Sequence, residues 1–124
     1  MEILTLRKRK DFVRVAQKGL KMITSTVVIQ AAQNLSDKEN IFVGYTTTKK
    51  IGKAHIRNRT RRRLRAAVRE LFLQHAHAGY TYVLIGRYNT ADCPFEKLKK
   101  DLKWGLKKLQ TTTQSETEND GQIS

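Results

Sequence analysis

A long amphipathic helix in the middle of the chain, predicted over Asn58–His77, restricts the fold more than any other feature. Its apolar residues recur every three or four positions, at Leu64, Ala67, Val68, Leu71 and Phe72. This spacing is the period of one buried helix face. Gly79 lies just beyond, where a glycine often ends a helix. The neighbouring elements must therefore provide an apolar surface for this face to cover.

Two further helices are predicted near the ends of the chain. The first covers Lys8–Lys18, places Phe12, Val15 and Ala16 on one face, and meets Gly19 at a position typical of a C-terminal glycine. The last begins near Asp92, with Pro94 in its first turn. Its buried stripe is expected at Phe95, Leu98, Leu102, Leu106 and Leu109.

Strands fill the space between the helices. Runs rich in β-branched residues predict strands at Thr24–Ala32, Ile41–Thr48 and Tyr82–Arg87. Asn34–Asn40 is expected to be a polar turn. The fold class is therefore α+β, with the order α-β-β-α-β-α, or α-β-β-β-α-β-α if either early strand is really two.

The chain of 124 residues is expected to hold one domain, over residues 1–109. Residues 110–124 contain no Lys or Arg, three acids and almost nothing apolar. Such a segment buries too little surface to offset its conformational entropy. We therefore expect a disordered, polar and acidic tail.

The charge balance selects the class of partner. Lys and Arg number 25 against 11 Asp and Glu, which gives a net charge of +14. Such a protein attracts polyanions. The longest apolar run is too short to span a bilayer, so no membrane partner is expected. The lone Cys93 cannot form an internal disulfide, which favours the cytoplasm.

Ten basic residues and no acid lie between Lys49 and Arg69. They are Lys49, Lys50, Lys53, Arg57, Arg59, Arg61, Arg62, Arg63, Arg65 and Arg69. The last helix instead carries only lysines. Arginine has a planar fork that binds phosphate bidentately, whereas lysine suits a solvated face. We therefore predict an RNA-binding surface at Lys49–Arg69.

Helical geometry arranges these side chains. At about 100° per residue, one sector of the long helix carries Asn58, Arg62, Arg65 and Arg69. The other arginines extend the basic surface nearly all round the first two turns. Asn58 has two interpretations, as the helix N-cap or as a direct RNA contact. In the preceding loop, Gly52 permits an unusual backbone angle among three lysines.

These residues resemble a known signature. Lys49-Lys50-Ile51-Gly52-Lys53-Ala54 is followed by Arg57-Asn58-Arg59 and then by Arg61-Arg62-Arg63-Leu64-Arg65. This pattern is similar to that of the bacterial ribonuclease P protein component family. The resemblance extends from about Leu6 to Leu109. It implies a compact α/β sandwich, like that of ribosomal proteins and a domain of elongation factor G, with a left-handed β-α-β crossover around the long helix.

The resemblance also implies a function, the removal of the 5′ leader from precursor tRNA by a ribonucleoprotein endoribonuclease. Its partners would be the ribonuclease P RNA subunit and precursor tRNA. The Lys49–Arg65 region would face the RNA subunit or the nearby cleavage site. Catalysis would belong to the RNA and to Mg²⁺ held by the RNA. A cleft for the leader would be lined by Phe12, with core packing as the alternative role of that ring. Gln30 and Ala16 stand at cleft positions where some members carry aromatic residues, which implies less stacking here.

No catalytic or metal-binding residues are predicted in the chain itself. Its three histidines have no zinc-like partners in the sequence, and Cys93 is alone. One alternative is a structural protein that binds ribosomal RNA without an associated enzyme. DNA is not an expected partner, because arginines on all sides of a helix suit phosphates better than base edges on one side.

Overall fold

The computed structural model describes residues 1–123, with side chains described over residues 1–110. Five strands and three α-helices make up these residues, together with one short 3₁₀ helix. In chain order they are β1 (Ile3–Thr5), α1 (Arg9–Lys18), β2 (Leu20–Ile23), β3 (Val27–Gln33), β4 (Ile41–Thr46), η1 (Lys49–Ile51), α2 (Ala54–His75), β5 (Tyr80–Gly86) and α3 (Phe95–Ile123).

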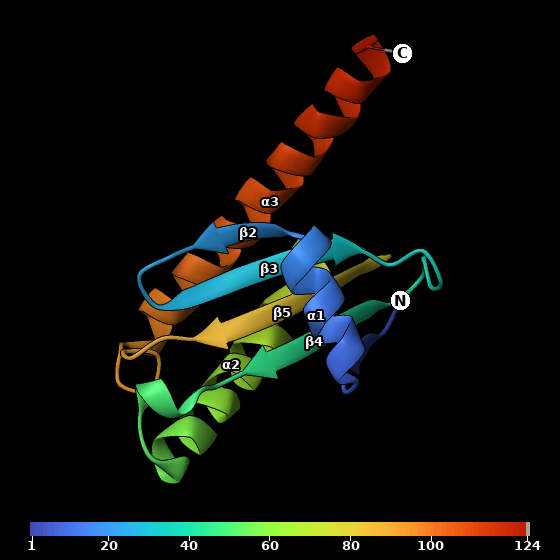
Figure 1. The fold of residues 1–124 in the computed structure, drawn as a ribbon. Helices are drawn as coiled ribbons and strands as arrows, with labels where there is room; N and C mark the ends of the chain where they lie inside the picture. The colour runs from blue at the N-terminus through green and yellow to red at the C-terminus, as the bar shows by residue number, and fades with distance from the viewer. Residues whose placement is uncertain (124) are drawn as a thin grey trace.

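The strands form one sheet in the order β1-β4-β5-β3-β2. Strand β5 is parallel to β4 and antiparallel to β3, so the sheet is mixed. Helix α1 covers one face, and α2 and α3 lie on the other (Figure 1). The connection from β4 through α2 to β5 is left-handed (Figure 1), as the resemblance implies, although right-handed crossovers are the general rule.

Successive side chains along each strand point to opposite faces of the sheet, which divides the core into two parts. Side chains on one face join α2 and α3 in the larger cluster, which includes Ile29, Tyr82 and Leu84. The opposite face joins α1 in a smaller cluster with Ala32 and Val83. This division follows from the two-residue period of a strand. The sheet therefore separates the α2 surface from the α1 surface.

Three strands lie between the first two helices, as in the longer of the two predicted orders, but neither predicted strand is split to give the third. Strand β2 lies ahead of the predicted start at Thr24. Residues 24–26 instead form a turn, in which the Thr24 hydroxyl accepts a hydrogen bond from the Val27 amide (3.1 Å) and donates one to the Val27 carbonyl (2.6 Å). A further strand, β1, was not predicted. Its three residues pair with β4 and are too few to show a period.

The predicted N-cap of the long helix is wrong, whereas Gly19 ends the first helix as predicted. Helix α2 begins at Ala54 after Lys53, so Asn58 lies within the helix and is not its N-cap. Gly19 follows α1, but its backbone is extended, with φ −85°. Its requirement is space, because a Cβ there would lie 2.5 Å from the Val15 carbonyl oxygen and 2.6 Å from that of Ala31.

The predicted apolar stripe of the last helix is confirmed for Leu98, Leu102, Leu106 and Leu109, which are buried, whereas Phe95 is only partly buried. The expected disordered tail over 110–124 begins at the end of this stripe. Beyond Gln110 it falls outside the described side chains, and it stays an expectation. No helix in the described part of the chain is long and apolar enough to cross a membrane.

Candidate RNA-binding surface

Helix α2 presents its arginines because its opposite side is fixed to the sheet. Thr60, Leu64, Ala67, Val68 and Phe72 are buried along one side. Arg62, Arg65 and Arg69 lie on the outer side and are exposed. None of the residues before Thr60 in α2 is buried. The first turn and a half therefore carries basic side chains without a covering layer, as the sequence predicts.

Arg62 lies between two shallow hollows of about 460 Å³ each. One is lined by Arg59, Arg63 and Phe95, and the other by Asn58, Arg61 and Arg65. Arginine side chains thus surround concave surface on both sides of Arg62. A phosphate in either hollow can meet more than one guanidinium, which is the arrangement that favours bidentate contacts.

Arg61 ties the helix to the preceding loop. Its Nη1 donates to the Thr47 hydroxyl at 2.6 Å, and its Nη2 donates to Oδ1 of Asn58. Asn58 is exposed and orients this guanidinium from one turn away. The side chain of Asn58 therefore positions Arg61, which neither interpretation of Asn58 from the sequence includes.

The loop before α2 has the backbone geometry that its glycine was expected to allow. Gly52 has φ +144°, a conformation that residues with a side chain rarely adopt. A Cβ at this position would lie 2.9 Å from Ile56 Cδ1. Lys49, Lys50 and Lys53 are exposed around it. The loop thus holds three lysines next to the first turn of α2.

Like Arg61, Arg63 has both Nη atoms hydrogen-bonded, but its two partners are backbone carbonyls beyond β5. Nη1 donates to the carbonyl of Thr90 at 2.9 Å, and Nη2 donates to the carbonyl of Cys93. The guanidinium also lies 5.9 Å from the centre of the Phe95 ring. Arg63 therefore holds the connection between β5 and α3, although the sequence groups it with the RNA-binding arginines.

Tyr45, on β4, is a site residue that the sequence did not reveal. Its ring centre lies 5.4 Å from the guanidinium carbon of Arg65, within cation–π distance. Burial raises the pKa of the Tyr45 hydroxyl, against the charges of Arg65 and Arg69, which lower it. Tyr45 is therefore a neutral platform that supports Arg65. Its position on a strand beneath the helix gives no signal in the sequence.

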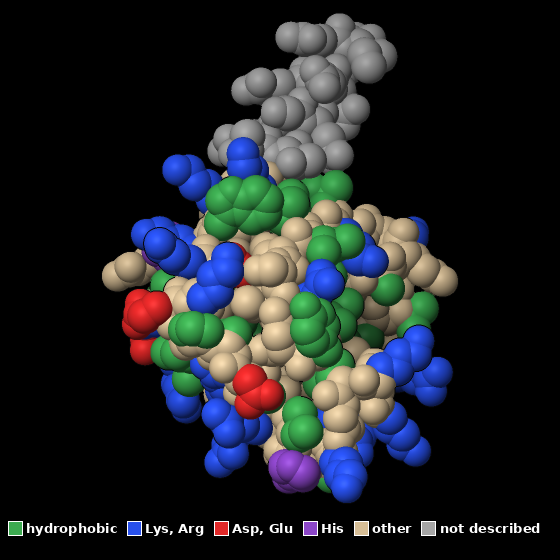
Figure 2. All heavy atoms as spheres, turned by 90° about the vertical axis from the view of Figure 1, so that its left-hand side faces the viewer, with side chains coloured by type: hydrophobic (Ala, Val, Ile, Leu, Met, Phe, Trp, Pro, Cys, Tyr) green, Lys and Arg blue, Asp and Glu red, His purple; other side chains and the backbone are tan. Residues whose placement is uncertain are grey.

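Among the side chains that the structure describes, the arginines of α2 have no acidic partners. Among the described side chains, the three ion pairs all involve lysines of α3: Lys97 with Asp101, and Lys99 with Glu70 and Glu96. Figure 2 shows the end of the molecule where α2 begins. Lys and Arg side chains lie around the lower half of this view, and acidic ones are few. The surface is therefore strongly positive and free to bind an anion.

The expected cleft residues lie on the opposite face of the sheet. Phe12 is half-buried in the α1 cluster, and a Cβ on Gly44 would lie 2.5 Å from its ring. Gln30 is half-buried on β3, two residues from Ala32, and faces the same side. Phe12 thus packs on the sheet, but its ring is not fully covered. The two residues share a face, as the resemblance requires.

Acidic, histidine and cysteine side chains do not gather into a metal site in the described part of the chain. No group of three or more such residues has a geometry that could hold an ion. The basic surface of α2 is therefore the most pronounced chemical feature of these residues.

A family model for ribonuclease P matches residues 2–110. The chain belongs to the ribonuclease P protein family. The ribonuclease P protein component of Paramagnetospirillum magneticum is 42% identical over 107 residues, which cover 84% of this chain and 80% of that protein. The one from Ruegeria pomeroyi is 42% identical over 108 residues and covers 86% of each chain.

Solved ribonuclease P proteins share the fold. A structure from Staphylococcus aureus superimposes with a TM-score of 0.71 at 24% identity, covering 83% of this chain and 92% of that one. The protein from Thermotoga maritima gives 0.68 at 24% identity, covering 79% and 90%. The α+β fold expected from the sequence is confirmed. The chain is thus an accessory protein subunit of the enzyme that processes the 5′ end of tRNA.

Proposed function

We propose that the α2 surface docks on the RNA subunit of ribonuclease P. The docking residues are Arg57, Arg59, Arg61, Arg62, Arg65 and Arg69 of α2, together with Lys49, Lys50 and Lys53 of the loop; Gly52 and Asn58 position them, and Arg63 supports the surface from beneath. The single observation that carries this proposal is the exposed arginine side of α2. It has no acidic partner within the described part of the chain and has hollows on both sides of Arg62.

The physical role of this surface is to neutralise phosphate charge. An RNA subunit and a precursor tRNA repel each other, and basic side chains between them lower that repulsion. Binding of this kind releases counterions and weakens steeply with salt. Divalent cations perform the same neutralisation, so the protein should reduce the concentration of Mg²⁺ that the RNA needs. The hydrolysis itself then belongs to the RNA and its bound Mg²⁺.

The proposal also includes a second binding surface, which contacts the unpaired 5′ leader of precursor tRNA. Phe12 and Gln30 share the α1 side of the sheet, away from the docking surface. The partly exposed ring of Phe12 can stack on one base, and the Gln30 amide can donate and accept hydrogen bonds. The leader would thus cross one face while the RNA subunit holds the other. Leader removal would take place in the cytoplasm, where both RNAs meet and precursor tRNA is processed.

The test is leader removal from a precursor tRNA by a bacterial ribonuclease P RNA at low Mg²⁺, with and without the full chain. The expected result is strong stimulation by the protein, and no cleavage when the RNA is omitted. Tight RNA binding without stimulation would contradict the proposal and favour a structural role on ribosomal RNA. The same experiment at high Mg²⁺ is the control, because there the RNA should need the protein less.

A further inference from the structure

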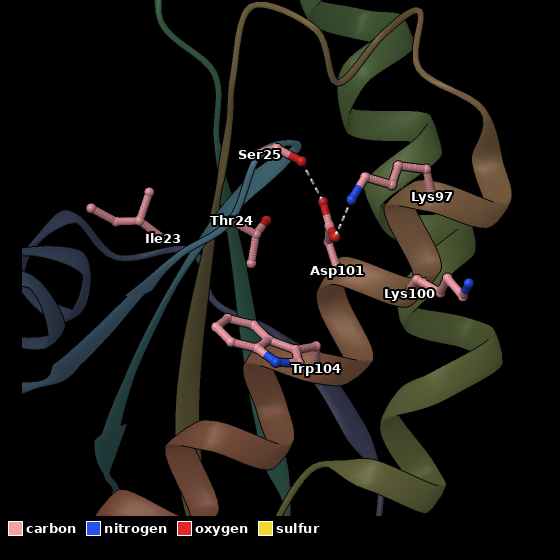
Figure 3. A pocket seen from close by; sticks show the side chains of 7 residues that line it. All are labelled: Ile23, Thr24, Ser25, Lys97, Lys100, Asp101 and Trp104. Atoms are coloured by element: carbon pink, nitrogen blue, oxygen red, sulfur yellow. Dashed lines mark hydrogen bonds and ion pairs between the residues drawn. The ribbon is translucent and has the colours of Figure 1, made fainter.

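A shallow hollow of about 500 Å³ lies between α3 and the turn that joins β2 to β3, away from the docking surface on α2. Its lining includes Ile23 and Ser25 from the turn side, and Lys97, Lys100, Asp101 and Trp104 from α3. Figure 3 shows Trp104, Asp101 and Lys97 projecting from α3 toward this turn. The hollow combines one large aromatic surface with two lysines.

The apolar part of this hollow is open to solvent. Trp104 has 47% of its surface exposed and Ile23 has 58%. Neither joins the buried clusters that hold the sheet to its helices. Single exposed apolar side chains are common on protein surfaces, but this half-exposed indole lines a hollow and offers a flat face for stacking. The exposed ring is therefore available to a ligand.

Positive charge surrounds the indole. Lys108, one turn along α3, places its Nζ 5.8 Å from the centre of the Trp104 ring. Lys100 lines the hollow one turn earlier. Among the described side chains, neither lysine has an acidic partner. An aromatic surface between two lysines matches a base with phosphates on both sides.

Asp101 does not oppose an anion here, because its carboxylate is already occupied. It accepts hydrogen bonds from Ser25 Oγ at 3.0 Å, Thr26 Oγ1 at 2.8 Å and Lys97 Nζ at 3.0 Å. Burial alone would raise its pKa, but these three donors hold the pKa of Asp101 below its ordinary value. Its charge is thus neutralised locally, and Lys100 and Lys108 remain.

We propose that the Trp104 hollow is a second RNA site, which binds an unpaired nucleotide by stacking its base on the indole and pairing the flanking phosphates with Lys100 and Lys108. An acidic peptide would satisfy the lysines but leaves the flat ring without a flat partner. A nucleotide satisfies both. This site lies on α3 and requires none of the α2 arginines, so it goes beyond the docking surface and does not depend on it.

Trp104 is the only tryptophan in the chain, so its fluorescence reports on this hollow alone. The probe is a ten-nucleotide oligoadenylate added to the full chain. Stacking should quench the emission of Trp104, with saturation at the concentration where a labelled oligonucleotide binds. Inorganic polyphosphate, which has the charge without the bases, should leave the emission nearly unchanged. Equal quenching by polyphosphate would overturn the stacking.

Variants separate this site from the α2 surface. Lys100→Glu with Lys108→Glu should weaken the affinity measured by Trp104 quenching on the order of tenfold, as loss of phosphate neutralisation predicts. Trp104→Ala should weaken binding of the labelled oligonucleotide by a similar factor, since one stacked base contributes on the order of tenfold. Lys38→Glu with Lys103→Glu, which changes the same charge outside the hollow, serves as the control and should leave the quenching unchanged.

The decisive background is Arg62→Ala with Arg65→Ala, which removes α2 contacts. Quenching by oligoadenylate should persist there with its own affinity, even if binding to the RNA subunit is lost. Quenching that disappears in this background would show that Trp104 only senses RNA on α2, and would overturn the proposal. So would emission that changes with protein concentration but not with RNA, because a second copy of the chain would then occupy the hollow.

Discussion

Helices α2 and α3 lie on the same face of the sheet and are both rich in basic residues, but they use that charge differently. The outer arginines of α2 have no acidic partners among the described side chains, and hollows lie on both sides of Arg62. In α3, Lys97 and Lys99 are held by Asp101, Glu70 and Glu96. The comparison teaches that the count of basic residues does not identify a docking surface. The choice of arginine and the absence of acids do.

Salt gives the largest effect by which this comparison can be tested. If five to ten phosphate contacts form, affinity for the ribonuclease P RNA should fall on the order of 10³-fold or more between low and moderate salt. The measurement is a filter-binding or anisotropy titration over a range of KCl. A shallow dependence would contradict phosphate docking by α2. It would place the affinity in base contacts or in apolar surface instead.

Arg62→Lys with Arg65→Lys sharpens the comparison, because it gives α2 the lysine chemistry of α3 while keeping both charges. Lysine cannot form the planar fork, so binding to the RNA subunit should weaken on the order of tenfold. Anisotropy with labelled RNA measures the change. Affinity equal to that of the original chain would show that charge alone matters, and that the contrast between the two helices has no chemical basis.

Arg63→Ala tests the α2 arginine that bridges two backbone carbonyls beyond β5. It removes two hydrogen bonds to the Thr90 and Cys93 carbonyls, which should cost about 1–3 kcal/mol of stability. Urea denaturation measures this loss, and RNA affinity should change little. Arg59→Ala is the matched control, since Arg59 is exposed and should change the stability by less than about 0.5 kcal/mol. Unchanged stability together with weakened RNA affinity for Arg63→Ala would instead make Arg63 a docking residue.

Lys99→Ala should have the smallest effect. Lys99 bridges Glu96 and Glu70, and the second of these contacts joins α3 to α2 at 2.9 Å. Exposed ion pairs contribute little to stability, so the urea midpoint should move less than for Arg63→Ala. RNA affinity should stay unchanged. A loss of affinity would mean that the ion-paired Lys99 shares the docking of α2, which would remove the distinction between paired and unpaired basic residues.

The sequence predicts well what depends on a period. The helical spacing correctly predicts the buried stripe from Leu64 to Phe72 and the buried leucines of α3. It does so because residues three or four apart lie on the same face of a helix. Ends of elements follow other rules. Helix α2 begins four residues before the predicted start. No side chain caps it at Lys53, so the sequence carries no N-cap signal there. Strand β1 depends on pairing with β4, nearly forty residues away.

The docking surface was predictable for the same reason, since its arginines follow the helix period. Contacts between distant segments were not. Arg63 differs from Arg62 only because the loop after β5 brings two carbonyls to it, 27 and 30 residues along the chain. Tyr45 lies under Arg65 because β4 runs beneath α2. The Trp104 hollow likewise requires the turn after β2 to meet α3, which the sequence cannot place.

The most direct test of the docking surface is the affinity of Arg62→Ala with Arg65→Ala for the ribonuclease P RNA at moderate salt. Two charge-assisted contacts of about 1.5–3 kcal/mol each predict a loss on the order of a hundredfold or more. Lys38→Ala with Lys103→Ala removes the same charge from outside α2 and should lose far less. Comparable losses in the two variants, or unchanged affinity in the first with its fold intact, would contradict docking by α2.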